Sequence, residues 1–581
     1  PGDRFAVLTF RSRIGSFETV NLPAISGITL DTLWADGPSA DTLFLVATAS
    51  GPPANLNRWV SPTSGNWSVG SNWSKGFAPV AADSVVIDVA GTYTVTLDVV
   101  PTLRNLMLGG SSGTQTLTGN NRLTLSGPSV VGANGVLIRS GTDLDGTGQL
   151  VNQGTINFTS ADVTLPLSNQ GTINVSGSTI VDGAISNSGT INVGGTVAFN
   201  GALTTVAGSI LRVGGVAAQT TLTVASGFTN NGSLQLTNTG GGFNAQLTVT
   251  TGTLTNSSTG TILSTFAAFG GSRTLAAQLD NQGTVTVSYP LTISRASAVH
   301  VNSGAINVSG SDLTLTQTGT TPSFTNTGTV TLSANQTWTV TGGTLDLTAG
   351  LVSGASGTLS VGGTASYQFT TATVTTPMLL AASITINAGA ITVPSLETLT
   401  LLSGTGIDET ISNSGTINVG GTVAFNGALT TVAGSILRVG GVAAQTTLTV
   451  ASGFTNNGSL QLTNTGGGFN AQLTVTTGTL TNSSTGTILS TFAAFGGSRT
   501  LAAQLDNSGT VTVSYPLTIS STLNQLSGGS LTVAASQTLT VSGLIQLFTS
   551  STTTALSGAT VTKNGGCFAL PGAIFSGFTC P

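Results

Sequence analysis

The sequence predicts an all-β protein, a β-solenoid (parallel β-helix) preceded by an N-terminal β-rich capping or assembly region. A short motif, Asn-x-Gly followed by a small residue and then an aliphatic one, recurs ten times along the chain. Thr, Ser, Asn, Val, Leu and Ile fill the stretches between the copies, which favours strands and tight turns over helices. Only 6% of the 581 residues are charged while 39% are hydrophobic, so the composition is not that of a disordered chain.

Each copy of the repeat is expected to form a turn that leads into a strand. Asn and Gly tolerate positive φ, and the residues that follow alternate between the two faces of a strand. In the sequence TINV of residues 172–175, Ile173 and Val175 would face one side and their neighbours the other. One coil cannot bury its apolar face alone, so stacked coils would share a core. The handedness of the helix stays open.

Asparagines at equivalent turns are expected to form a ladder of side-chain amides along the stack. The predicted turn and ladder residues are Asn152, Asn169, Asn187, Asn281, Asn302, Asn326, Asn413 and Asn507. Two further copies of the motif begin at Asn230 and Asn456. Such a ladder would fix the position of each coil on the next.

The chain is expected to divide into four regions. These are a β-rich closing or assembly segment at residues 1–50, a Trp-containing β region that starts the solenoid at 51–125, the shaft at 126–545, and a C-terminal cap at 546–581. Within the shaft, residues 185–294 and 411–520 match at every position except that Gln282 is replaced by Ser508. A solenoid accepts inserted coils, whereas such a duplication would disrupt a compact enzyme.

Both ends of the solenoid carry residues that could close it. Trp59, Trp67 and Trp73 are expected to cap the first coil, with a platform for stacking on sugars as the alternative. An uncapped coil would expose strand edges to other chains. Cys567 and Cys580 could form a disulfide that pins the last coil, which would contribute roughly 3 kcal/mol in the loop-entropy model, and two free thiols are the alternative.

Catalytic groups are scarce. His300 is the only histidine, and Glu18, Glu397 and Glu409 are the only glutamates. A polysaccharide lyase or hydrolase needs several acidic or basic side chains that converge on one groove, so no catalytic residue is expected. His300 is expected to face outward near a turn.

No metal site and no cofactor are expected. The chain has no Cys-x-x-Cys or His-x-x-x-His spacing. The acidic pair Asp143 and Asp145 lacks the further ligands of a calcium loop and is expected in a solvated turn, while Asp408 and Glu409 are expected in a polar junction loop. The net charge of −5 argues against a nucleic-acid partner, and no apolar stretch is long enough for a transmembrane segment.

Two N-terminal segments carry family patterns. Residues 2–23 read GDRFAVLTFRSRIGSFETVNLP, and residues 57–88 read NRWVSPTSGNWSVGSNWSKGFAPVAADSVVID, followed by GTYTVTLD and LRNLMLGG. The first resembles the segment that closes a β-helical module in bacterial surface proteins, and the second resembles the opening of β-helical secreted proteins. The similarity is to autotransporter passengers and haemagglutinin-type adhesins, and it implies an extracellular or cell-surface location in a bacterium.

These observations favour a non-enzymatic extracellular structural protein, such as a filament or biofilm matrix subunit. Because the closing pattern comes first in the chain, residues 1–50 would pack on the C-terminal end of another copy, giving a head-to-tail homopolymer. An adhesin stalk that binds surface glycans or other cells is the alternative. A β-helical polysaccharide lyase or hydrolase is a second alternative.

Overall fold

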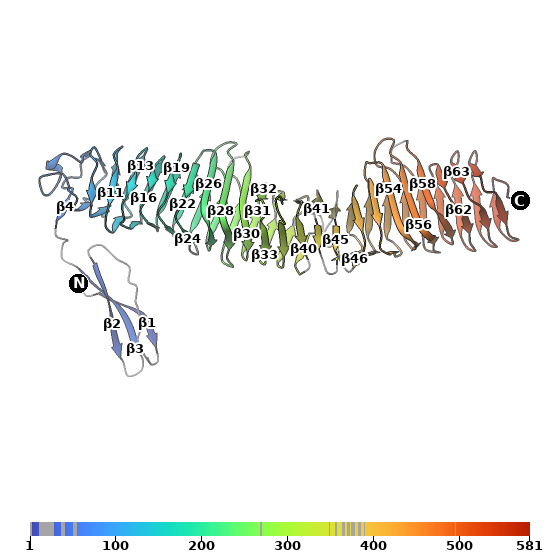
Figure 1. Cartoon of the computed structure of the whole chain (residues 1–581), viewed down its shortest axis with the longest axis horizontal. Coiled ribbons are helices and arrows are strands. Elements are labelled where there is room, and N and C mark those ends of the chain that lie inside the picture. The colour runs from blue at the N-terminus through green and yellow to red at the C-terminus, as the bar shows by residue number, and fades with distance from the viewer. Residues whose placement is uncertain are drawn as a thin grey trace. The chain divides into compact units, whose positions relative to one another are not determined.

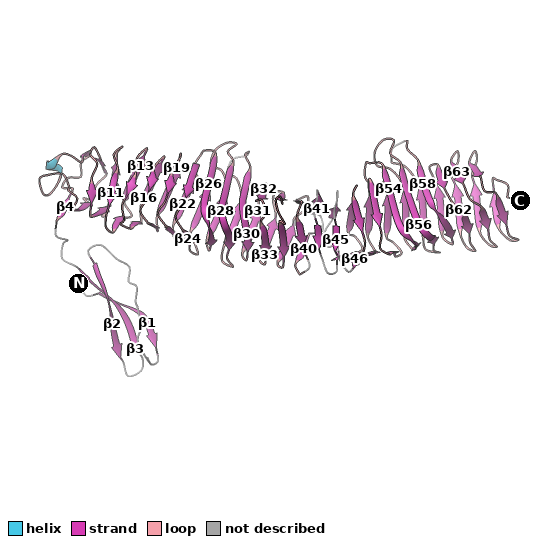
Figure 2. Ribbon diagram, in the orientation of Figure 1, coloured by secondary structure: helices cyan, strands magenta, loops and turns pink. Residues whose placement is uncertain are grey.

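The protein is a parallel β-solenoid, which confirms the predicted fold class (Figure 1). In the part of the chain that is described, strands dominate and the only helical segment is the 3₁₀ turn η1 (Gly70–Asn72) (Figure 2). The computed structural model describes residues 3–10, 28–36, 41–49, 55–267, 270–347, 349–354, 357–362, 366–368, 372–373, 378–380, 385–387, 390–493 and 496–580.

The first three strands form a small antiparallel sheet of their own. Strand β3 (Asp41–Ala49) lies in the middle, between β1 (Asp3–Phe10) and β2 (Ile28–Asp36). Parallel pairing begins with β4 (Leu56–Arg58), which pairs with β6 (Ser84–Ile87). The segment expected to be β-rich therefore differs in strand direction from the solenoid.

In the regular coils of residues 150–199, each turn consists of three strands. Every strand pairs in parallel with the strand three places further along the chain, because three short strands complete one circuit. The strands of these turns are β15 (Leu150–Asn152), β16 (Thr155–Thr159), β17 (Asp162–Val163), β18 (Leu167–Asn169), β19 (Thr172–Ser176), β20 (Ile180–Val181), β21 (Ile185–Asn187), β22 (Thr190–Val193) and β23 (Gly195–Phe199).

The core is a column of aliphatic side chains at matching positions of successive turns. Ile173 pairs in register with Ile156 on one side and with Ile191 on the other, and all three are buried. Ile173 and Val175 face inward while Thr172 and Asn174 are partly exposed, as the alternation predicts. Each turn thus shields the apolar face of the turn before it.

The chain forms two compact units, Pro1–Ala277 and Gln278–Pro581. The duplicated block produces corresponding strands at both positions, some of which differ by one residue at an end. Strands β26 (Thr220–Asn230) and β54 (Thr446–Asn456) have the same length and the same succession of buried and exposed residues. The same holds for β28 (Ala245–Asn256) with β56 (Ala471–Asn482), and for β30 (Arg273–Asn281) with β58 (Arg499–Asn507).

Candidate functional site

The predicted asparagines of unit 1 end their strands with the side chains turned into the solenoid. Asn152, Asn169 and Asn187 are buried at the ends of β15, β18 and β21. Asn152 Nδ2 donates to Asn169 Oδ1 at 2.8 Å, and Asn169 Nδ2 donates to Asn187 Oδ1 at 2.7 Å. Asn169 Nδ2 also donates to the backbone oxygen of Thr190 at 3.1 Å. The ladder is therefore internal, and it pairs polar groups that water does not reach.

In unit 2 the ladder has a regular part and an interruption. Asn281 donates to Asn302, and Asn302 donates to Asn326, over Nδ2–Oδ1 distances of 2.6 and 2.7 Å. Asn413 faces Thr431 in the register and donates instead to a backbone oxygen, that of Ile436, at 2.9 Å. At the last of the predicted positions, Asn507 Nδ2 donates to Gln525 Oε1 at 3.0 Å.

Four ladder residues lie outside the predicted set: Asn230 and Asn456, which carry the motif, and Asn256 and Asn482, which do not. Asn230 Nδ2 donates to Asn256 Oδ1 at 2.9 Å, and Asn456 Nδ2 donates to Asn482 Oδ1 at 2.8 Å in the second block. Asn256 and Asn482 are each followed by SSTG, so the glycine comes four residues later rather than two. The same motif with a turn two residues longer therefore marks Asn256 and Asn482.

The three tryptophans lie together under the first turn. Trp59, Trp67 and Trp73 are buried, and Trp73 Nε1 donates to the backbone oxygen of Trp67 at 2.7 Å. The ring of Trp73 meets those of Trp59 and Trp67 edge-on, with centroids 5.1 and 4.7 Å apart. Buried indoles cannot stack on a sugar, so their position fits the capping role and not the sugar platform.

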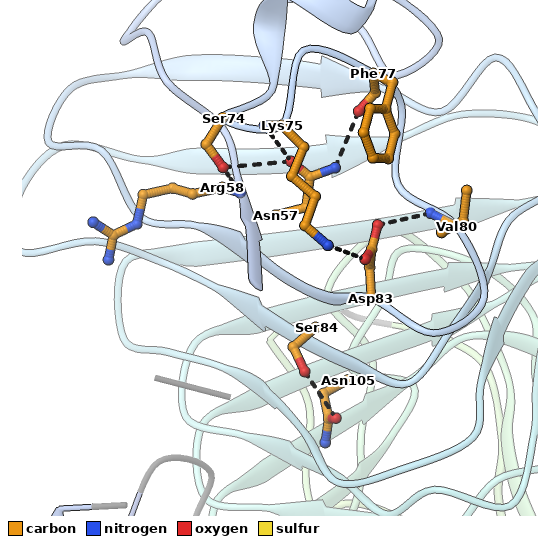
Figure 3. A network of polar contacts seen from close by, with 9 residues as sticks. All are labelled: Asn57, Arg58, Ser74, Lys75, Phe77, Val80, Asp83, Ser84 and Asn105. Carbon is orange, nitrogen blue, oxygen red and sulfur yellow. Dashed lines mark hydrogen bonds and ion pairs between the residues drawn. The ribbon is translucent and has the colours of Figure 1, made fainter. Parts of the chain in front are cut away.

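Polar contacts hold residues 59–83, the cap loop, in which the three tryptophans lie (Figure 3). Lys75 Nζ lies 2.6 Å from Oδ1 of the buried Asp83, whose Oδ2 accepts the Val80 N–H at 3.0 Å. Asn57 Nδ2 donates to the backbone oxygen of Phe77 at 3.0 Å, as Figure 3 shows. These bonds tie the cap loop to the first turn.

Four large apolar side chains are exposed on the cap loop. The side chains of Val60, Val69, Phe77 and Val80 are between 44% and 53% exposed. These four residues fall within residues 60–80, which also contain β5 (Gly65–Asn66) and η1, and exposed large hydrophobic residues that lie together are typical of a surface that contacts another protein. This loop is therefore a candidate contact surface at the beginning of the solenoid.

The last turn is closed by the disulfide but keeps open strand edges. Cys567 and Cys580 are bonded, with their Cα atoms 5.1 Å apart. Strand β66 (Thr560–Lys563) ends its sheet, and β67 (Cys567–Ala569) has β64 (Ile545–Leu547) as its strand neighbour in the described part of the chain. Nearby, Phe568 is 51% exposed and Ile574 is 61% exposed.

Removing the disulfide is expected to loosen this last turn. The double variant Cys567→Ser with Cys580→Ser should lose about 3 kcal/mol of local stability, because the bond closes a loop between residues 13 apart. Hydrogen exchange of residues 560–580 measures the loss. Wild type under reducing conditions should match the variant, and the variant itself should not respond to reductant. Equal protection with and without the bond would contradict the assigned role.

The expectation that His300 faces outward is wrong. It lies on β33 (Val299–Asn302) and is only 1% exposed, and its Nδ1 accepts the Leu279 N–H at 3.1 Å. Burial, and to a smaller extent the charge of Arg295, lower the pKa of the imidazole to about 4. The signal was present in the sequence: Asn302 points inward, so the residue two places before it on the strand must also point inward.

The acidic pairs do not converge on a common centre. Asp145 was expected in a solvated turn, but it is buried on a strand, where it forms an ion pair with Arg122 and accepts the Thr164 Oγ1 at 3.1 Å. Asp408 and Glu409 lie in the expected loop before β49 (Thr410–Asn413). Across the described ranges, no three His, Cys, Asp or Glu side chains gather closely enough to hold a metal ion.

A second ladder runs along the outside of unit 1. Asn174 Nδ2 donates to Asn157 Oδ1 at 2.8 Å, and Asn192 Nδ2 donates to Asn174 Oδ1 at 2.9 Å. Arg212 then donates to Asn192 Oδ1 at 2.8 Å and to Gln235 Oε1 at 2.9 Å. This outer ladder was not among the predicted features, although the asparagine of each TIN string stands between two inward residues.

The buried ladder, the tryptophan cap and the last turn are the features from which a function can be inferred. No helix in the described part of the chain is long and apolar enough to cross a membrane. No family model matches the chain, and no curated protein or solved structure matches it. The residues of the solenoid itself therefore carry the inference.

Proposed function

We propose that this chain is a non-enzymatic structural protein of the bacterial cell exterior, a β-solenoid fibre or matrix subunit that joins head to tail with other copies. The observation that carries the proposal is the matching fold of the long strands in the two copies of the duplicated block. Strands β26 and β54 have the same bounds within the block and the same buried face. A segment whose fold is independent of its position adds length without new chemistry, as a spacer requires.

The disulfide and the surface composition support a location outside the cell. Bonds such as Cys567–Cys580 persist in oxidising compartments and are rare in reducing cytosol. The chain has 19 acidic and 14 basic residues in 581, so its surface depends on Thr, Ser and Asn for solubility. Such a surface keeps its properties when ionic strength changes, because few charges are there to be screened.

The head-to-tail contact would use two surfaces described above. The cap loop presents Phe77 and Val80 at the beginning of the solenoid, and the last turn presents Phe568 with the edges of β66 and β67. Strands β1 to β3 of one copy would add to those edges by main-chain hydrogen bonds. A contact between two different surfaces is heterologous, so it continues into an open filament.

Charges placed on the last turn are expected to prevent assembly. In the double variant Phe568→Lys with Ile574→Lys, both substituted side chains are already exposed, so the fold should persist. Two charges beside an open edge oppose strand addition, and filaments should be absent in electron micrographs. Val432→Lys, at an exposed position in the shaft, is the matched control and should assemble as the wild type does.

A second variant tests the other side of the contact. Deleting residues 1–50 should give single subunits by light scattering while circular dichroism of the solenoid is unchanged. Filaments that form normally from this deletion variant would overturn the head-to-tail arrangement. Release of unsaturated or reducing ends from a glycan by the purified protein would overturn the non-enzymatic role.

An adhesin stalk is the second candidate, and the outer ladder favours it. Arg212 lies between Asn192 and Gln235, and the second block repeats the arrangement with Arg438 bonded to Gln461. Rows of amides and guanidinium groups can bind the hydroxyl groups of a sugar chain. Saturable binding of single subunits to a glycan, lost in the variant Arg212→Ala with Arg438→Ala, would favour the adhesin over the fibre.

A further inference from the structure

The two copies of the block are followed by different sequences, and one backbone N–H therefore has a different hydrogen-bond acceptor in each copy. Leu279 on β30 and Leu505 on β58 are the same residue of the block. The Leu505 N–H donates to the backbone oxygen of Thr522 at 2.9 Å. The Leu279 N–H donates instead to Nδ1 of His300 at 3.1 Å. An imidazole thus replaces a backbone acceptor at one of two otherwise equivalent junctions.

The surroundings of His300 are apolar. Its ring lies 6.4 Å from that of Phe324, which meets Trp338 at 5.4 Å. Its Nε2 is buried and has no hydrogen-bond partner in the described part of the chain. Since Nδ1 accepts a hydrogen bond, the neutral ring carries its proton on Nε2. A second proton could bind only at Nδ1, the atom that the Leu279 N–H occupies.

Few charged groups face this ring. Arg295 precedes β33, and its positive charge disfavours a second positive charge on the imidazole. Asp280 follows Leu279 on β30, and its carboxylate accepts a hydrogen bond from Gln282 Nε2 at 2.8 Å. The neighbouring strands β36 (Ser323–Asn326) and β38 (Thr337–Thr341) read SFTN and TWTVT and contribute no charge.

We propose that the junction between β30 and β33 is a proton-sensitive joint in unit 2, whereas the equivalent junction after β58 is insensitive to protons. Protonation turns Nδ1 from an acceptor into a donor, so that it faces the Leu279 N–H as a second donor. It also places a charge among Phe324 and Trp338, which is unfavourable in an apolar core. The joint therefore opens in acid, and the Leu505 bond does not change.

The pH range follows from the imidazole. Its pKa in the closed joint is lowered to about 4, whereas in an opened joint the ring returns to its ordinary value near 6.5. The opened form therefore binds the proton first as the pH falls below about 6.5. The closed joint loses stability as the pH falls from about 6.5 to about 4. Below about 4 the imidazole of the closed joint is itself protonated.

Hydrogen exchange measured by mass spectrometry tests the joint with an internal control. Peptides that extend through Gln282 or Ser508 have different masses, so the Leu279 and Leu505 junctions are read separately in one sample. The intrinsic exchange rate changes with pH by the same factor for the Leu279 and Leu505 amides. The ratio of their measured rates is therefore free of this effect. The ratio is expected to rise on the order of tenfold between pH 7 and pH 4, because one buried hydrogen bond is lost.

Two substitutions separate titration from packing. His300→Asn places an amide oxygen where Nδ1 was, so the bond should persist and the ratio should not depend on pH. His300→Leu removes the acceptor, so the ratio should be high at every pH. An unchanged ratio in the wild type would overturn the proposal, as would the same rise in His300→Asn. The wild-type measurement decides the question even if His300→Leu fails to fold.

Discussion

Replacing Asn169 by alanine is expected to lower the unfolding free energy of the surrounding turns by roughly 3–5 kcal/mol, since each buried group left unpaired costs about 1–3 kcal/mol. Asn169 accepts from Asn152 and donates to Asn187 and to the Thr190 oxygen. Its removal takes a donor from Asn187 Oδ1 and from the Thr190 oxygen, and leaves Asn152 Nδ2 with its bond to the Thr172 oxygen alone, in a region that water does not reach. Urea denaturation, together with hydrogen exchange of residues 150–190, measures the loss.

Asn174→Ala is the matched control. Asn174 also bonds to an asparagine on each side, at 2.8 Å and 2.9 Å, but it lies on the outer face. Water can replace its bonds, so the loss should be about 0.5–1 kcal/mol. Equal losses at Asn169 and Asn174 would contradict the view that the internal ladder holds the register of the turns.

Replacing Trp73 by alanine is expected to open the first turn. Truncating a buried tryptophan costs about 3–5 kcal/mol, and Trp73 contacts both Trp59 and Trp67. With the cap loosened, the first strands of the solenoid should become accessible to other chains. Thermal unfolding should begin at a lower temperature, and light scattering should detect irregular aggregates.

Val69→Ala provides the comparison for the cap. Val69 belongs to the same loop but is exposed, so its truncation should change stability by no more than about 0.5 kcal/mol. Irregular aggregation that appeared equally in Val69→Ala would show that the loop surface, and not the tryptophan cluster, protects the strands. A Trp73→Ala protein as stable as the wild type would remove the capping role.

The fold could be predicted because one local rule repeats. Asn-x-Gly sets the turn, and the alternation that follows decides which side chains enter the core, as at Ile173 and Val175. The same rule indicated where the amide ladder would lie. It did not show that the amides are internal, because a turn motif alone does not state which face its asparagine takes.

The errors came from treating polar residues one at a time. The phase of its strand places His300 inside, whereas Asp145 pairs in register with the outward Thr124 and is buried by its contacts with Arg122 and Thr164. Asp145 is stable there because Arg122 comes from the neighbouring turn, a partner that is 23 residues away in sequence. Such pairings follow from the register between turns of unequal length, which only the three-dimensional structure supplies.

The duplicated block has a genetic consequence. Two nearly identical stretches in one gene can recombine, and unequal crossing-over between them would delete or add 226 residues, the distance from Ile185 to Ile411. The sequence at the recombined boundary would be the same as one already present in the chain. Every strand would therefore still pair with a strand of matching sequence. Related strains are expected to carry chains whose lengths differ by this increment, and amplification across the gene would reveal them.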